Sequence, residues 1–304
     1  MNIIQIHNKV PYPAKDGGSI AVFNLSKGFA SLDHTVDIIA LNTKKHLVSI
    51  EKIKKELPAG IQIHAYYINT DIKLYKLVLN LLFSKLPYNA VRFIDKGFAV
   101  TLSELLKKKK YDIVQIEGLY MLPYLHIIKT YSKAIVGFRA HNIEYEIWER
   151  SYKNERSFIK RIYLKSLYRR IKRFEQSFLN DYDLLIPITQ RDANNFTKLG
   201  NIRPIHVSPT GINITKFRNT KDVYDPTKLF HLGSLDWYPN QEGLLWFLEH
   251  VWKKMTEEND QITFSVAGRN APRELISKLR LYKNVIYDGE VESAEDYINA
   301  HSIM

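Results

Sequence analysis

A cation, an imidazole, an amide and a carboxylate follow one predicted strand. The segment 139–144 comes directly after the apolar run Ala134–Phe138. In an open parallel sheet, ligands bind beyond the carboxyl ends of the strands. An imidazole at that edge can hydrogen-bond a ligand hydroxyl, whereas a lone histidine would more often be structural. We therefore predict that His141 belongs to a site. The neighbours expected to hold the loop or an acceptor are Arg139, Asn142 and Glu144.

Two glycines lie between the first predicted strand and a helix. Gly17 and Gly18 end the loop that begins at Pro11. Glycines at a helix N-terminus let an anionic group approach the backbone, where the N–H groups and the helix dipole favour negative charge. This pattern predicts a phosphate contact, although two glycines can also simply start a helix.

Two further glycine turns close strands in the second half of the chain. Gly233 and Ser234 follow one apolar run, and Gly268 and Arg269 follow the next. Because both turns come at the carboxyl ends of strands, we expect them at one sheet edge. A guanidinium there is suited to neutralising a diphosphate.

Two other polar patterns have structural explanations. Asp181 and Asp183 have the D-x-D spacing used by some metal-dependent sugar transferases, but Asp183 leads directly into a strand and no other carboxylates gather nearby. We predict a structural role and no metal site. Asn240 after Pro239 is predicted to be the N-cap or first turn of a helix.

Apolar strand-length runs alternate with helix-length segments throughout, which predicts an α/β fold with parallel sheets. A polar stretch at 216–228 is the best linker candidate, and we expect domains at 1–220 and 221–304. Helices are expected at 18–32, 157–179, 240–257, 272–281 and 294–300. Strands are expected at 3–6, 36–41, 61–66, 113–116, 134–138, 184–188, 205–207, 229–235, 262–267 and 285–287.

The formal net charge of +12 indicates an anionic partner or substrate. Lys107–Lys110 is expected to be a solvated helix end, favoured by the helix dipole. Cysteine is absent, which excludes disulfides and thiol chemistry, and no apolar run is long enough to span a bilayer. The opening residues are expected to form a strand rather than a secretion signal. The absence of cysteine fits a cytoplasmic location, and we expect the protein to be peripheral on the inner face of the cell membrane.

Two segments have amphipathic patterns that leave alternatives open. In 157–179, apolar residues recur at three- and four-residue steps on a basic helix. This stripe is expected either to pack on the core or to lie on an anionic membrane, and no recognition motif favours nucleic acid. The segment Leu74–Phe83 is likewise either a membrane contact or a buried helix.

Taken together, these motifs resemble the retaining family 4 glycosyltransferases, which have two Rossmann-like domains in the GT-B arrangement. The resemblance spans nearly the whole chain. Its carriers are the Gly17-Gly18 loop and the segments 112–117, 139–144, 209–213 with Phe217, 232–240, 266–269 and 289–291.

The resemblance implies transfer of a sugar from a nucleotide-sugar donor to a hydroxyl of a glycan or lipid-linked acceptor, with retention and without metal or cofactor. His141 is similar to the family's donor-sugar histidine, and the Gly17-Gly18 loop to the loop near the donor phosphates. Residues similar to parts of the nucleotide pocket are Gly233, Ser234, Gly268, Arg269, Glu290 and Val291.

The chain also departs from the family pattern. Ser234 and the residues around Asn240 stand where the family commonly has a diphosphate-binding Arg and Lys. The family's paired glutamates would lie beyond residue 304, so we expect an incomplete second domain and a weakly active or inactive catalyst. Alternatives are a non-catalytic nucleotide- or membrane-binding or assembly module and, more remotely, a related epimerase or phosphorylase.

Overall fold

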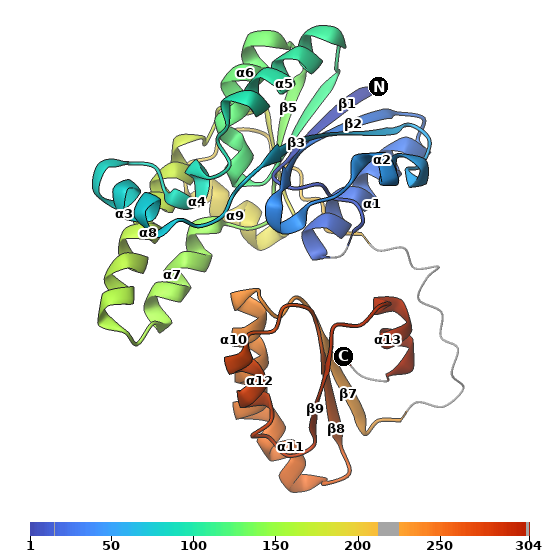
Figure 1. Ribbon diagram of the computed structural model, residues 1–304, viewed down its shortest axis with the longest axis vertical. Coiled ribbons are helices and arrows are strands. Elements are labelled where there is room, and N and C mark those ends of the chain that lie inside the picture. The colour runs from blue at the N-terminus through green and yellow to red at the C-terminus, as the bar shows by residue number, and fades with distance from the viewer. Residues whose placement is uncertain (15, 212–224, 302–303) are drawn as a thin grey trace. The chain divides into compact units, whose positions relative to one another are not determined.

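The chain divides into two compact units, Met1–Gly211 and Ile212–Met304 (Figure 1). The computed structural model describes residues 1–14, 16–211, 225–301 and 304. The domain boundary expected at 220 and 221 lies outside the described residues. Both units are α/β, and both sheets are parallel, as the alternating pattern predicts.

The sheet of unit 1 has six strands in the order β3-β2-β1-β4-β5-β6. Nearly all predicted strands are present, but Ile205 makes only an isolated bridge to Leu185 and the predicted strand 205–207 does not form. The strands are β1(Asn2–His7), β2(Thr35–Thr43), β3(Ile61–Ile68), β4(Ile113–Glu117), β5(Ile135–Ala140) and β6(Leu184–Pro187).

Helices cover both faces of this sheet, as a parallel sheet requires. Phe23 of α1 and Ile53 of α2 pack with Ile38, while Phe98 of α5 packs with Ile39 on the opposite face. The prediction that the Lys107 cluster lies at a helix end is confirmed by α5. The α-helices are α1(Gly17–Ser31), α2(Ile50–Ile53), α3(Leu74–Phe83), α4(Tyr88–Val91), α5(Lys96–Lys108), α6(Leu125–Tyr131), α7(Glu144–Asn154), α8(Phe158–Ser177) and α9(Gln190–Lys198).

The apolar stripe of α8 packs against the core. Leu167, Ile171 and Phe174 are buried, and Leu164 and Phe178 pack beside them. Of the alternatives open for this stripe, core packing is therefore the correct one. For α3 the buried alternative is wrong, because none of its residues is buried. In the described residues, no helix is long and apolar enough to cross a bilayer.

Unit 2 has a three-stranded sheet in the order β7-β8-β9. Its core includes Trp252, whose indole N–H donates to the Lys283 carbonyl at 2.9 Å, and Phe264. Asn240 lies in the first turn of its helix, whose N-cap is Trp237. The elements are β7(Lys228–Leu232), α10(Tyr238–Phe247), the π-helical stretch η5(Leu248–Trp252), α11(Lys253–Glu258), β8(Thr263–Ala267), α12(Arg273–Leu279), β9(Val285–Gly289) and α13(Ala294–Ala300).

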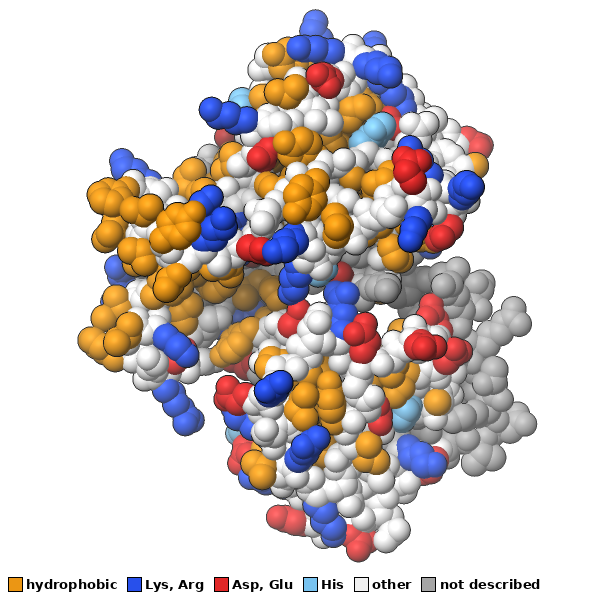
Figure 2. Space-filling view, viewed as in Figure 1, with side chains coloured by type: hydrophobic (Ala, Val, Ile, Leu, Met, Phe, Trp, Pro, Cys, Tyr) orange, Lys and Arg blue, Asp and Glu red, His pale blue; other side chains and the backbone are white. Residues whose placement is uncertain are grey.

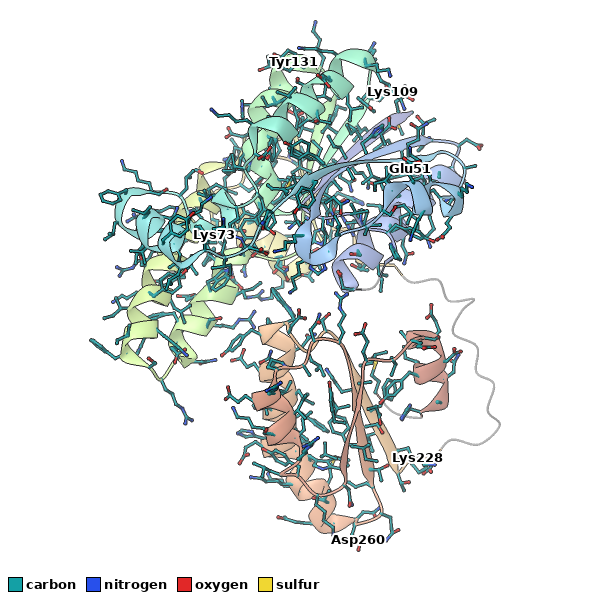
Figure 3. All side chains as sticks on the ribbon, viewed as in Figure 1. Glu51, Lys73, Lys109, Tyr131, Lys228 and Asp260 are labelled. Atoms are coloured by element: carbon teal, nitrogen blue, oxygen red, sulfur yellow. The ribbon has the colours of Figure 1, made fainter. Side chains whose placement is uncertain are left out.

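Asp37 of β2 is a buried carboxylate with three partners. Lys109 Nζ lies 2.7 Å away, Tyr111 donates its hydroxyl at 2.8 Å, and His64 Nε2 lies at 3.3 Å. Lys109 is labelled in Figure 3. Burial alone raises the pKa of Asp37, but these hydrogen bonds and the Lys109 charge outweigh it and lower the pKa to about 2.

Replacing Asp37 with Asn is expected to lower the free energy of unfolding at pH 7 by about 2 kcal/mol. Because the folded-state pKa is depressed, this stabilisation is present above pH 4 and is lost as the pH falls toward 2. Urea unfolding at several pH values measures it, with the exposed Asp181→Asn as the control. An equal loss at pH 7 and pH 3 would contradict the assignment.

Candidate functional site

The strand order of unit 1 reverses between β1 and β4. Such a switch point leaves a crevice at the carboxyl ends of the two strands, where ligands bind. His7 ends β1 and Glu117 ends β4, and the two are paired in register. Glu117 is paired in turn with Arg139 of β5. The topology therefore places three polar residues side by side at the switch point.

Glu117 is a buried carboxylate at the centre of this group. It lies 2.6 Å from His141 Nε2 and 3.5 Å from an Arg139 guanidinium nitrogen, and the Gln115 amide also donates to it. Burial raises the pKa of Glu117, but the His141 hydrogen bond and the charges of His141 and Arg139 outweigh this and lower it. The carboxylate is therefore ionised at neutral pH.

His7 lies beside the carboxylate as a neutral imidazole. Its Nδ1 bonds the Lys9 carbonyl, which can only accept, so Nδ1 carries the proton. Burial lowers the pKa of His7 to about 4, although Glu117 and the bond to Lys9 act in the opposite direction. At neutral pH His7 is uncharged, so the negative charge of Glu117 is compensated by the cationic Arg139.

His141 connects this buried group to solvent. Its side chain is 20% exposed, whereas that of Glu117 is fully covered. An ionised carboxylate can only accept, so His141 Nε2 donates to Glu117. In the neutral imidazole, Nδ1 is then left as an acceptor. The arrangement can therefore present a fixed hydrogen-bond acceptor to a hydroxyl of a bound ligand.

The three predicted neighbours of His141 have different surroundings. Arg139 is buried and directed at Glu117, and Asn142 is exposed. Glu144 begins α7 and accepts from the Tyr120 hydroxyl at 3.0 Å. The backbone N–H groups of Glu144 and Tyr145 donate to Glu175 of α8. Burial raises the pKa of Glu144, and that of Glu175 to about 8. These contacts hold the loop that carries His141.

The glycine loop joins the same end of β1. Lys9 pairs with Asp16 at 2.6 Å, and Asp16 caps α1 by accepting from the Ser19 N–H at 3.0 Å. A β-carbon added at Gly17 would meet nothing within 4 Å. The N-terminus of α1 is therefore already capped by the Asp16 carboxylate, and the space next to Gly17 is open.

In unit 2 the glycine turns that follow the strands contact one another. The Gly233 N–H donates to the Ala267 carbonyl at 3.2 Å, and the Gly268 N–H to the Gly289 carbonyl at 2.7 Å. A β-carbon on Gly268 would lie 1.8 Å from the Gly233 carbonyl oxygen. Only glycine allows the backbones to approach this closely.

Polar side chains surround this contact. Arg269 Nε donates to the Ser234 hydroxyl at 3.2 Å, and the Asn240 amide donates to the Ser234 carbonyl at 3.0 Å. Glu290 and Val291 follow Gly289 of β9, and Glu290 is exposed. The expectation that these turns share one edge is confirmed within unit 2. The guanidinium, serine and glycine backbone can together contact a diphosphate.

The residue pattern predicts His141 and Arg139 as site residues but not His7, and Glu117 enters it only as the last residue of the segment 112–117. Both missed residues end strands whose other residues are largely apolar. A polar residue ending such a strand is a usable signal. It becomes informative only when the strand order places the two ends side by side.

Comparisons with known proteins agree with this architecture. A family model described as Glycosyltransferase Family 4 matches residues 15–216. A Klebsiella pneumoniae protein described as "Uncharacterized 44.6 kDa protein in cps region" is 26% identical over 288 residues, which cover 94% of this chain and 69% of that protein.

Two solved structures share the fold. Anabaena HepE in complex with UDP and glucose is 12% identical, with a TM-score of 0.59 over 98% of this chain and 72% of that chain. A mutant of S. aureus TarM, in complex with Fondaparinux, alpha-GlcNAc-glycerol and UDP, is 11% identical. Its TM-score is 0.64 over 99% of this chain and 80% of that chain. At these identities the likeness establishes the fold alone, and the predicted GT-B-like pair of Rossmann-type domains is confirmed.

Replacing Gly268 with Ala is expected to destabilise unit 2 by about 2–3 kcal/mol, because the new methyl group overlaps a backbone carbonyl. Gly243→Ala is the matched control. It lies inside α10 with nothing within 4 Å of an added β-carbon, so alanine is expected to be neutral or stabilising by up to about 1 kcal/mol. Calorimetry measures both, and equal transition temperatures would contradict the close approach.

Proposed function

Because this chain belongs to glycosyltransferase family 4, whose model matches residues 15–216, we propose that it transfers a sugar from a nucleotide-sugar donor to an acceptor hydroxyl. Transfer is proposed to retain the configuration of the anomeric carbon and to need neither metal nor cofactor. The acceptor is proposed to be a glycan or a lipid-linked glycan in polysaccharide or glycolipid synthesis, on the cytoplasmic side of a membrane.

The arrangement of His7, Glu117 and Arg139 at the switch point is the observation that carries this proposal. It leaves one partly exposed group, His141, whose orientation is fixed by a buried carboxylate. A side chain whose rotation and tautomer are fixed is preorganised for one ligand hydroxyl.

His141 is the proposed contact to the donor sugar. Its Nδ1 accepts a hydrogen bond from a sugar hydroxyl and so fixes the ring against the acceptor. Glu117, Arg139 and His7 act through His141 and are positioning residues. Asn142 and Glu144, which flank His141 in the same loop, are proposed to border the acceptor.

The turns of unit 2 are proposed to bind the donor nucleotide. Arg269, held by Ser234, supplies a cation for the diphosphate, and Gly233 and Gly268 let the phosphates approach the backbone. Glu290 and Val291 are proposed to border the same pocket. The Gly17-Gly18 loop of unit 1 is proposed as a second phosphate contact, beside the Asp16 carboxylate.

The proposed reaction exchanges one bond for another at the anomeric carbon. The acceptor oxygen forms a bond to this carbon while the bond to the leaving diphosphate oxygen breaks. The acceptor hydroxyl proton passes to the departing phosphate. Negative charge develops on the diphosphate, so a preorganised cation lowers the barrier.

Direct binding of a nucleoside diphosphate tests the donor assignment. UDP is the first ligand to titrate because the HepE and TarM complexes contain it, and GDP is the comparison. We expect calorimetric binding of one of them and a loss of affinity of about tenfold or more in Arg269→Ala. Arg280→Ala, an exposed arginine at the other end of α12, is the control. Binding of neither nucleotide by the wild-type chain would refute the assignment.

Slow transfer of the donor sugar to water tests His141 without knowledge of the acceptor. His141→Ala is expected to reduce donor hydrolysis on the order of 10²-fold, with nucleoside diphosphate affinity unchanged. Glu117→Gln is expected to reduce the rate less, on the order of tenfold, because the amide accepts the same bond without the charge. His126→Ala and Glu104→Gln are exposed controls. A wild-type rate in His141→Ala would exclude the proposed contact.

A further inference from the structure

We propose that α3 and the first half of α8 dock unit 1 onto an anionic lipid surface. We call this area the α3–α8 surface, meaning residues 72–86 and 156–170. The proposal rests on unit 1 alone, and the proposed sugar transfer is not needed for it.

Helix α3 exposes apolar side chains in an unusual arrangement. Eight of its ten residues are apolar or aromatic, yet none is buried. Six form two adjacent rows at four-residue steps, which occupy one half of the helix surface. Their exposed fractions are 76% for Leu74, 59% for Tyr75, 44% for Val78, 52% for Leu79, 67% for Leu82 and 82% for Phe83.

The sides of α3 divide clearly. Leu77, Asn80 and Leu81 face the protein and line a small pocket with Tyr163 and Leu167 of α8. An ordinary surface helix directs its apolar rows at the core. In α3 the wider apolar face is directed at solvent, and no segment of the described part of the chain covers it.

The start of α8 adds a second apolar group. Phe158 is 76% exposed, Ile159 80% and Ile162 56%. These residues are distinct from the buried stripe of α8, which begins about one turn later. They lie at the end of α8 that follows α7, where the helix pair protrudes from unit 1 (Figure 1).

The two helices form one surface. The Arg170 guanidinium of α8 donates to the Asn80 carbonyl at 3.0 Å and the Leu81 carbonyl at 2.5 Å, which caps the end of α3. Figure 2 shows hydrophobic side chains gathered over α3 and over the end of the α7–α8 pair, with Lys and Arg among them. Lys73, labelled in Figure 3, precedes α3.

Charge identifies the partner. The α3–α8 surface contains nine Lys and Arg and no Asp or Glu. With the adjoining residues up to 94 and up to 173 the surplus reaches twelve, which equals the formal net charge of the whole chain. A surface with apolar side chains beside basic ones can bind anionic lipid. The apolar side chains insert into the bilayer, and the basic side chains pair with the anionic headgroups. The basic residues are Lys73, Lys76, Lys85, Arg92, Arg156, Lys160, Arg161, Lys165, Arg169, Arg170, Lys172 and Arg173.

Other occupants fit less well. A symmetric dimer would place this surface against itself, with the like charges of both copies opposed. Nucleic acid would match the charge but not the large aliphatic side chains, which offer no stacking to bases. An anionic bilayer matches both properties, because its headgroups take the cations and its acyl region takes the Leu, Ile and Phe side chains.

Vesicle sedimentation tests the proposal. We expect the chain to sediment with vesicles containing 30% phosphatidylglycerol at least tenfold more strongly than with pure phosphatidylcholine vesicles, and less as salt is raised. The apolar variant Leu79→Ser, Leu82→Ser, Phe83→Ser is expected to lose at least tenfold in partition. Its control is Leu32→Ser, Ile202→Ser, Leu281→Ser, which removes equally exposed side chains elsewhere.

A charge variant separates the electrostatic contribution to vesicle binding from the contribution of the apolar side chains. Lys73→Gln, Lys76→Gln, Lys160→Gln is expected to weaken binding and flatten its salt dependence, relative to Lys52→Gln, Lys55→Gln, Lys108→Gln. Far-UV circular dichroism checks that all variants are folded.

Three outcomes would overturn the proposal. The first is an apolar variant that binds vesicles as its control does, and the second is a wild-type chain that binds neither kind of vesicle. The third is a wild-type dimer in light scattering that only the apolar variant dissociates, which would assign the surface to a second copy of the chain. Nucleotide binding measured in the same preparations keeps this result separate from the proposed transferase function.

Discussion

The buried carboxylate of Glu117 is the interaction on which the site depends. A carboxylate without water is costly unless cations and hydrogen-bond donors compensate it. Here Arg139 supplies the charge, and Gln115 and His141 supply donors. All come from β4, β5 or the loop after β5, so pairing of the strands sets their mutual positions. His141 is therefore fixed by the sheet and not by its own loop alone. The contacts that compensate the buried charge of Glu117 also orient His141, the partly exposed member of this group.

Unit 2 uses a different device at the corresponding strand ends. Its turns are fixed by a backbone contact between two glycines, because a β-carbon on Gly268 would overlap the Gly233 carbonyl oxygen. The Arg269 side chain is then held by a hydrogen bond to Ser234 of the neighbouring turn. In unit 1 the buried side chain of Glu117 positions the side chain of His141. In unit 2 the close backbone contact between Gly233 and Gly268 fixes the turns from which Ser234 and Arg269 extend.

The position of the basic residues in the structure is more informative than the net charge itself. Many cations are paired on the surface, as Lys153 is with Glu149 and Lys253 with Glu249, and such exposed pairs add little stability. The surplus lies in two segments far apart in sequence that meet at α3 and α8. The same segments expose many large apolar side chains, including Leu74, Phe83 and Ile159. A soluble surface rarely combines both features without a partner.

The sequence by itself determined the α/β class, most strands and the position of His141 at a strand end. It could do so because a buried strand has a continuous apolar run and a surface helix has a stripe, and both are local patterns. Only the tertiary structure decided that His7 and Glu117 lie beside Arg139, because strand order is a property of the whole sheet. It also decided that the α8 stripe is buried while the rows of α3 are not. Periodicity shows that a helix has an apolar face, but the packing of other segments determines whether that face is covered.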